Sequence, residues 1–191
     1  MAMIDVLETG IEGLLELTPK VFVDERGYFF ESYNEQVLRE AGIHQTFVQD
    51  NESKSTRGVL RGLHMQLEKP QAKLVRVVAG EVFDVAVDVR LKSPTFGKWY
   101  GLILSGENKK QFYIPKGFLH GFLVLSEEAI FTYKCSDYYD PDGEFGVYFN
   151  DKNIAIDWPI HSVGDLTVSN KDARNKSLVE LKHILEKQGS I

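Results

Sequence analysis

Short runs of apolar residues, broken by turns, dominate the chain. Residues 74–90 hold two such runs on either side of a glycine, and from 83 to 89 every second residue is Phe or Val. This period of two is typical of a half-buried strand. Further strand-like runs cover residues 111–115, 120–125 and 129–137. Short strands repeated at intervals of about eight to twelve residues predict a β-sandwich or barrel.

Helical periodicity is confined to two segments. Residues 34–42 begin at an asparagine suited to a helix N-cap and end at a glycine, which predicts a helix of about two turns. In residues 177–188, leucine and isoleucine recur at helical spacing, so we expect an amphipathic helix packed on the body. Two further strand pieces flank Arg26 and Gly27 near the front of the chain.

Length and composition narrow the class of protein. The chain of 191 residues has no repeat or linker, so residues 1–191 predict one domain with a β core at about 20–165 and a terminal helix at about 177–188. The net charge of −6 argues against a nucleic-acid surface. No apolar run reaches the roughly 20 residues of a membrane span, and residues 1–10 lack the features of a signal peptide. The single Cys135 can form no intrachain disulfide, so we expect a cytoplasmic protein.

The segment VLRGLHMQ, residues 59–66, places an arginine and a histidine in what otherwise has the character of a core strand. Simple alternation would direct Arg61 and His64 to opposite faces, whereas a bulge at Gly62 would turn both toward one space. His120, in the apolar run FLHGF, raises a similar question. Each histidine has two interpretations, as a structural side chain bonded to a neighbour or as a functional group.

Three other residues are equally ambiguous when taken singly. Tyr133 suits a packed aromatic, Asp172 an exposed charge or helix cap, and Cys135 a small core residue. A catalytic metal site needs three protein ligands. Neither His64 nor His120 has a second histidine at the spacing found in metal-binding β-barrels, so we expect no metal.

Longer motifs give these residues a context. In order along the chain they are KVFVDERGYFFESYN, FVQDNESKSTRGVLRGLHMQ, KLVRVVAGEVFDVAVDVR, SPTFGKW, IPKGFLHGFLVLSE, YKCSDYYDPDGE, NDKNIAIDWP and SNKD. Through them the chain resembles the dTDP-4-dehydrorhamnose 3,5-epimerase family from about residue 4 to residue 180. The resemblance implies an all-β, cupin-like double-stranded β-helix (jelly roll) with a few short peripheral helices and a C-terminal helix. It also implies a homodimer that works without a metal or an organic cofactor.

The resemblance further implies a substrate and four catalytic residues. The substrate would be a dTDP-linked 4-keto-6-deoxy sugar, whose ketone acidifies the C–H bonds at C3 and C5, and the product dTDP-4-dehydro-L-rhamnose. His64 would be the base, because an imidazole titrates near neutral pH, and Asp172 would fix its tautomer. Tyr133 would be the acid on the opposite face of the sugar. Lys73 would stabilise negative charge at the keto oxygen.

Substrate binding is carried over in the same way, onto positions that match the family's contacts with the nucleotide sugar. These are Arg26, Glu31, Gln49, Asp50, Asn51, Arg61, His120, Tyr138, Glu144 and Lys171. Arginine suits a diphosphate because its planar group can bond two oxygens at once. The chain departs from the residues common in the family at Met65, Ala72 and Lys176.

Two alternative functions stay open. Close relatives epimerise only C3 or only C5, or move the ketone, with nearly the same residues, and the tilt of the sugar between His64 and Tyr133 would decide among them. A cupin-like sugar-nucleotide binding protein without catalysis is the alternative from a different class. The presence of His64, Asp172 and Tyr133 together favours the enzyme and the double epimerisation.

Overall fold

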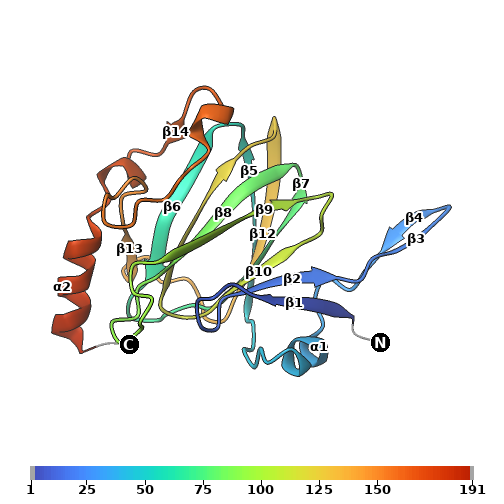
Figure 1. Ribbon diagram of the computed structural model, residues 1–191, viewed down its shortest axis with the longest axis horizontal. Helices are drawn as coiled ribbons and strands as arrows, with labels where there is room; N and C mark the ends of the chain where they lie inside the picture. The colour runs from blue at the N-terminus through green and yellow to red at the C-terminus, as the bar shows by residue number, and fades with distance from the viewer. Residues whose placement is uncertain (1–2, 190–191) are drawn as a thin grey trace.

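The computed structural model describes residues 3–189, whose body is a sandwich of two β-sheets (Figure 1). The strand order of the first sheet is β1 (Ile4–Glu8), β2 (Leu15–Pro19), β10 (Gln111–Ile114), β7 (Lys73–Ala79), β12 (Glu128–Cys135) and β5 (Gln49–Thr56). The strand order of the second is β13 (Glu144–Gly146), β6 (Val59–Gln66), β11 (Phe118–Val124), β8 (Glu81–Asp88) and β9 (Trp99–Ser105), and β14 (Thr167–Val168) pairs with β6. Only the β14–β6 pair is parallel among the pairings of these strands. The expected all-β, cupin-like architecture is confirmed.

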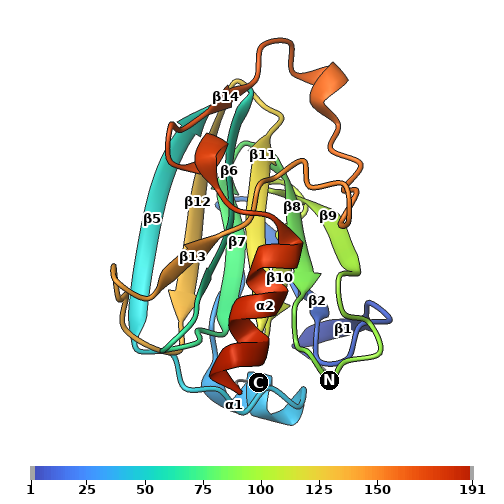
Figure 2. The same cartoon turned by 90° about the vertical axis from the view of Figure 1, so that its left-hand side faces the viewer.

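Both predicted helices are present. Helix α1 (Glu35–Glu40) starts at Asn34, whose side chain accepts hydrogen bonds from two backbone N–H groups of the first turn. Helix α2 (Leu178–Gln188) starts at a capping box formed by Ser177, and its buried leucines face the second sheet (Figure 2). No helix among residues 3–189 is long and apolar enough to cross a membrane.

Two short 3₁₀ turns and one hairpin complete the secondary structure. The 3₁₀ turns cover Ile160–Ser162 and Asp172–Arg174. Strands β3 (Phe22–Asp24) and β4 (Gly27–Phe29) form a two-stranded hairpin that projects from the body on the side opposite α2 (Figure 1). All six hairpin residues of these strands are exposed, and the ammonium of Lys109 lies over the Tyr28 ring at 4.0 Å from its centre.

Strand β8, in the second sheet, is buried on both faces along most of its length. The inner face of this sheet packs against the first sheet through side chains such as Val82 and Phe122, and its outer face packs under α2 and the segment that includes Trp158. The strand predicted at 83–89 is present as β8, but the expectation that only one of its faces would be buried is wrong. Helix α2 and residues 149–163 cover the outer face, so the second set of alternating positions is also excluded from solvent.

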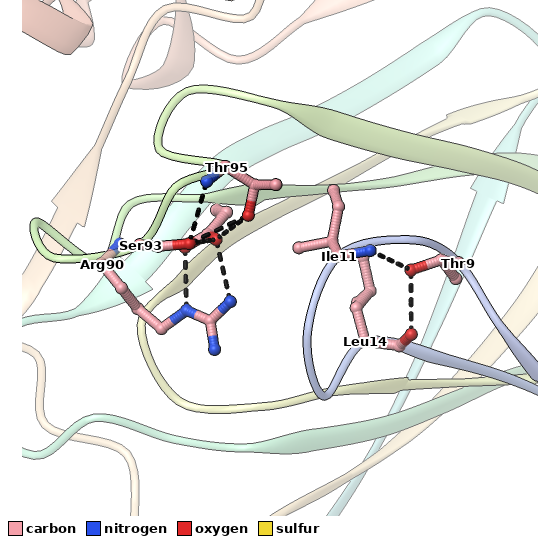
Figure 3. Close-up of polar contacts among 7 residues, drawn as sticks. Thr9, Ile11, Leu14, Arg90, Ser93 and Thr95 are labelled. Carbon is pink, nitrogen blue, oxygen red and sulfur yellow. Dashed lines mark hydrogen bonds and ion pairs between the residues drawn. The ribbon is translucent and has the colours of Figure 1, made fainter.

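Polar side chains fix the connection between β8 and β9. The carboxylate of Asp88, fully buried, accepts hydrogen bonds from the guanidinium of Arg90 and from the hydroxyls of Ser93 and Thr95 (Figure 3). Burial alone would raise the pKa of Asp88, but these bonds together hold it below its usual value. The ionised carboxylate of Asp88 therefore holds the β8–β9 connection in place.

Candidate active site

A cavity of 540 Å³ opens between the two sheets and adjoins a second cavity of 370 Å³. The two share His64, Lys73, Tyr133 and Glu144. Ten of the fourteen residues expected from the sequence line one or both cavities, and they are His64, Lys73, Tyr133, Asp172, Gln49, Asn51, Arg61, His120, Glu144 and Lys171. One continuous hollow therefore brings most of the expected site together.

A β-bulge in β6 directs Arg61 and His64 into the same cavity. On β11, His120 pairs with His64 and Phe122 pairs with Arg61, so the pairing shifts by one residue between them. Gly62 occupies the shift with φ +108°, and a Cβ there would lie 2.6 Å from the carbonyl oxygen of His120. The bulge that the sequence left open is present, and it needs glycine for this close approach.

His64 and Asp172 form a tight pair. His64 Nε2 lies 2.6 Å from Asp172 Oδ1, and the backbone N–H of Gly62 donates to the other oxygen at 3.3 Å. Burial opposes ionisation of Asp172, but the bonds from His64 and Gly62 outweigh it and hold its pKa below the usual value. An ionised carboxylate can only accept, so in the neutral imidazole Nε2 carries the hydrogen and Nδ1 has the free lone pair. His64 is thus arranged as a base through Nδ1.

Tyr133 and Lys73 face the cavity from the opposite sheet. They lie on the adjacent strands β12 and β7, where Lys73 pairs with Cys135, two residues beyond Tyr133, and the Lys73 ammonium lies 5.5 Å from the centre of the Tyr133 ring. Burial raises the pKa of Tyr133, so its phenol stays protonated well above neutral pH. Burial lowers the pKa of Lys73. A phenol that can donate a proton and a lysine amino group therefore stand across the cavity from the imidazole base.

Glu144 links three neighbours at the rim. Its Oε2 accepts hydrogen bonds from Tyr139 Oη at 2.6 Å and from Lys171 Nζ at 2.7 Å, while Oε1 lies 3.8 Å from His64 Nδ1. The hydrogen bond to Glu144 is the main cause that raises the pKa of Tyr139 to about 12. Tyr138, expected from the sequence, is exposed and lines neither cavity. Its neighbour Tyr139 occupies that wall instead.

A second histidine–carboxylate pair lies beside the first. His120 Nε2 is 3.0 Å from both oxygens of Asp84, which is fully buried on β8. Burial raises the pKa of Asp84, and a charged His120 opposes that rise. The sequence did not mark Asp84 as a site residue, because it stands at a position where an alternating strand is expected to expose a polar side chain. The available signal was an acidic residue within a run of valines.

Three expected residues lie elsewhere. Asp50 points to the outer face of β5, where Lys134 bonds both of its oxygens, so it does not face this cavity. Arg26, at the tip of the projecting hairpin, pairs with Asp24 and is largely exposed. Glu31 follows the hairpin and accepts a bond from Asn34. Arg26 and Glu31 therefore contact nothing in the cavity of their own chain.

The side chains around the cavity include residue types that bind metals elsewhere. Among the residues that the structure describes, no group of three or more His, Cys, Asp and Glu side chains has an arrangement that could hold a metal ion. Cys135 is buried behind Lys73, with its sulfur 3.9 Å from the Lys73 ammonium. Of the two cavity histidines, His64 is instead engaged with Asp172 and has Glu144 at 3.8 Å, and His120 is engaged with Asp84.

Comparison of the chain with known proteins identifies its family. The family model described as dTDP-4-dehydrorhamnose 3,5-epimerase matches residues 8–180. A curated epimerase of that name from Methanothermobacter thermautotrophicus is 53% identical over 180 residues, which cover 94% of this chain and 97% of the relative. The chain belongs to the dTDP-4-dehydrorhamnose 3,5-epimerase family.

Solved structures of relatives agree with the fold of this epimerase. A crystal structure of the dTDP-6-deoxy-D-glucose-3,5-epimerase from Legionella pneumophila, in complex with dTDP-4-keto-L-rhamnose, is 54% identical with a TM-score of 0.91. The match covers 95% of this chain and 96% of that chain. A more distant relative, a 3'-monoepimerase from Streptomyces bikiniensis in complex with dTDP-quinovose, is 32% identical with a TM-score of 0.82 over 94% of this chain and 89% of that one. This chain is thus an isomerase, and it is more similar in sequence and fold to the 3,5-epimerase than to the 3'-monoepimerase.

Proposed function

We propose that this epimerase converts dTDP-4-dehydro-6-deoxy-D-glucose to dTDP-4-dehydro-L-rhamnose by inverting C3 and C5. One observation carries the proposal. The His64–Asp172 pair, with His64 on one sheet and Asp172 on a 3₁₀ turn beside it, faces Tyr133 and Lys73 on the other sheet across a single cavity. Inversion at carbon needs a base on one face of the sugar ring and an acid on the other. The two walls of the cavity supply these groups.

Each group has a defined step. Nδ1 of His64 removes the proton from the carbon next to the C4 ketone, and Asp172 stabilises the resulting imidazolium. The electron pair moves into the ketone to form an enolate, whose oxygen Lys73 stabilises. Tyr133 then returns a proton from the opposite face. Because the ketone itself takes up the electrons, the proposal includes no metal or organic cofactor.

The nucleotide end of the substrate is assigned to the polar rim. Arg61, whose Nε donates to Ser55 at 3.1 Å, and Lys171 offer positive charge for the diphosphate. His120 faces the same cavity beside His64. Gln49 and Asn51, joined by a 3.0 Å hydrogen bond on β5, offer amide groups to the nucleotide. These residues provide charge and hydrogen bonds but no proton transfer.

A homodimer completes the proposal. The β3–β4 hairpin extends away from the cavity of its own chain and exposes Val23, Tyr28 and Phe29. An apolar extension of this kind is covered when it packs on a second copy. Arg26 and Glu31 would then reach the partner's cavity, which accounts for their distance from their own. We also place the enzyme in the cytoplasm, since its one cysteine forms no intrachain disulfide.

Proton NMR of dTDP-4-dehydro-6-deoxy-D-glucose incubated with the protein in D2O tests the reaction. We expect deuterium at both C3 and C5, and the rhamno-configured product when a reductase traps it. Exchange at one carbon alone would replace the proposal with a single-site epimerase. Measurable dTDP binding without any exchange would make the chain a binding protein.

A further inference from the structure

Among the described residues, no carboxylate is in direct contact with Lys73, although the charge of Glu144 acts on it across the cavity. No ion pair joins Lys73 to a carboxylate within residues 3–189, whereas six other lysines of this part of the chain have one. Its ammonium instead donates to the amide oxygen of Gln71 at 2.8 Å and approaches the sulfur of Cys135 at 3.9 Å. The face of the Tyr133 ring lies on a further side. Every group in direct contact with the ammonium is therefore neutral while Cys135 stays a thiol.

Gln71 is itself held in one orientation. It is buried, with 9% of its surface exposed. Its Nε2 donates to the backbone carbonyl of Asp137 at 2.8 Å, in the segment that follows β12. This bond decides which end of the amide faces Lys73, because only the oxygen can then accept from the ammonium. Gln71 thus presents a fixed acceptor at the wall of the smaller cavity.

The count of donors on Lys73 leaves one for the substrate. An ammonium has three N–H groups. Gln71 accepts one, and the thiol of Cys135 is in reach of a second as a weak acceptor. The remaining N–H is free for an oxygen in the cavity, which Lys73 lines together with His64 and Tyr133.

We propose that Gln71 is a positioning residue of this epimerase, whose neutral amide aims the Lys73 ammonium at the keto oxygen and leaves its full charge available to the enolate. This inference rests on the role given to Lys73 above. A carboxylate at the same place would also orient the lysine, but it would pair with the charge that the enolate needs. An amide supplies orientation without that competition.

Two substitutions at Gln71 separate these effects. Gln71→Glu keeps the shape of the side chain and adds a negative charge. The charge should favour the protonated form of Lys73 and reduce the stabilisation that its ammonium gives to the enolate. We expect kcat to fall about tenfold or more, short of the 10²–10³-fold typical of losing an oxyanion donor outright, with KM changed by less than about threefold. Gln71→Met removes the acceptor at similar length and should also lower kcat.

The pH profile distinguishes positioning from a merely structural role. In Gln71→Glu the alkaline fall in kcat should move to higher pH, because a nearby anion favours the protonated lysine. In Gln71→Met it should move to lower pH, because the ammonium loses an acceptor. A structural defect would not move the two limbs in opposite directions. The matching changes at Gln45, a partly buried glutamine that lines neither cavity, should leave kcat and the profile unchanged.

A double-mutant cycle keeps this inference apart from the proposed function. Lys73→Met should reduce deuterium exchange at C3 and C5 severely, and adding Gln71→Met to it should cause little further loss. If Lys73→Met retains normal exchange, the role given to Lys73 is wrong. If Lys73→Met is impaired while both Gln71 variants keep the wild-type kcat and pH profile, the inference about Gln71 alone is overturned. An equal Gln71→Met loss with and without Lys73 would overturn it as well.

Discussion

His64 has its two ring nitrogens in different surroundings, and catalysis depends on that difference. Nε2 is occupied by Asp172, while Nδ1 faces the cavity and has Glu144 at 3.8 Å. The pair therefore fixes both the tautomer and the direction of the lone pair before any substrate arrives. Because the ring is held by a carboxylate rather than by core packing, its removal should affect chemistry far more than folding.

Substitution His64→Ala should therefore reduce turnover by at least the 10²–10⁴-fold typical of one general base. Affinity for dTDP should stay within a few-fold of wild type, since Arg61 and Lys171 remain. Product formation by NMR and dTDP affinity by calorimetry measure the two effects. Near-normal turnover in this variant would remove His64 from the proposed mechanism.

Lys73 makes stability depend on pH with a definite sign. Burial lowers the pKa of Lys73 in the folded protein, whereas the unfolded chain keeps the usual value of 10.5. The folded state thus disfavours the proton that the unfolded state accepts. This difference lowers the unfolding free energy by its full amount below the lowered pKa. The effect disappears as the pH rises toward 10.5.

Relative to Lys73→Met, wild type should therefore gain unfolding free energy as the pH is raised from neutral toward the usual lysine value. The gain should be about 1.4 kcal/mol for each unit by which burial lowers the pKa. Urea denaturation of both variants at several pH values measures it, and titration of all other groups cancels in the difference. A difference that stays constant with pH would show that burial leaves the Lys73 proton unaffected.

Among the elements, β6 depends most on a single backbone feature. Gly62 lets two polar residues on either side of it reach one cavity, and it does so at positive φ against the backbone of β11. A methyl group at Gly62 would lie 2.7 Å from Cα of Gly121, a separation that neither strand can accept without moving. The bulge therefore couples the shape of the site to the packing of two central strands.

Gly62→Ala should destabilise the fold by about 2 kcal/mol or more and misplace His64. Gly10→Ala is the matched control, because Gly10 also has positive φ but has nothing within 4 Å of the added Cβ. The control should lose only about 1 kcal/mol from its backbone conformation. Urea midpoints and turnover of the folded protein measure both effects. Equal losses in the two variants would mean that close approach to β11 has no role.

The apolar elements could be predicted from the sequence, and the polar ones could not. Alternating valines indicated β8, and leucines at helical spacing indicated α2, because both elements bury apolar side chains. Strand β5 has no apolar residue among Gln49–Thr56, so no periodicity marked it. Asp84 and Gln71 were overlooked because their roles depend on partners distant in the chain, His120 and Lys73. Local patterns carry no information about such contacts.

At the scale of the whole molecule, the proposed dimer makes each active site composite. Arg26 is 84% exposed in its side chain and lies on the hairpin, while His64 lies in the body. Two inactive variants, Arg26→Ala and His64→Ala, should then complement each other when co-expressed with different tags. About a quarter of wild-type activity should return, because half of randomly paired dimers are mixed and each has one intact site. Mixtures without any recovery would place both residues in the same subunit's site.

Strand β5 forms one edge of its sheet, and β12 is the only strand that pairs with it in the described part of the chain. Its eight residues are all polar, and Ser55 alone among them is buried. A strand with so little apolar burial opens locally at low free energy. Strand β5, which carries the residues proposed to bind the nucleotide, should therefore open transiently while the rest of the sandwich stays folded. Amide exchange by mass spectrometry should be faster in β5 than in β7, and dTDP should slow it selectively. Substrate would then enter the cavity while β5 is open, and the bound nucleotide would afterwards stabilise β5 in its closed position.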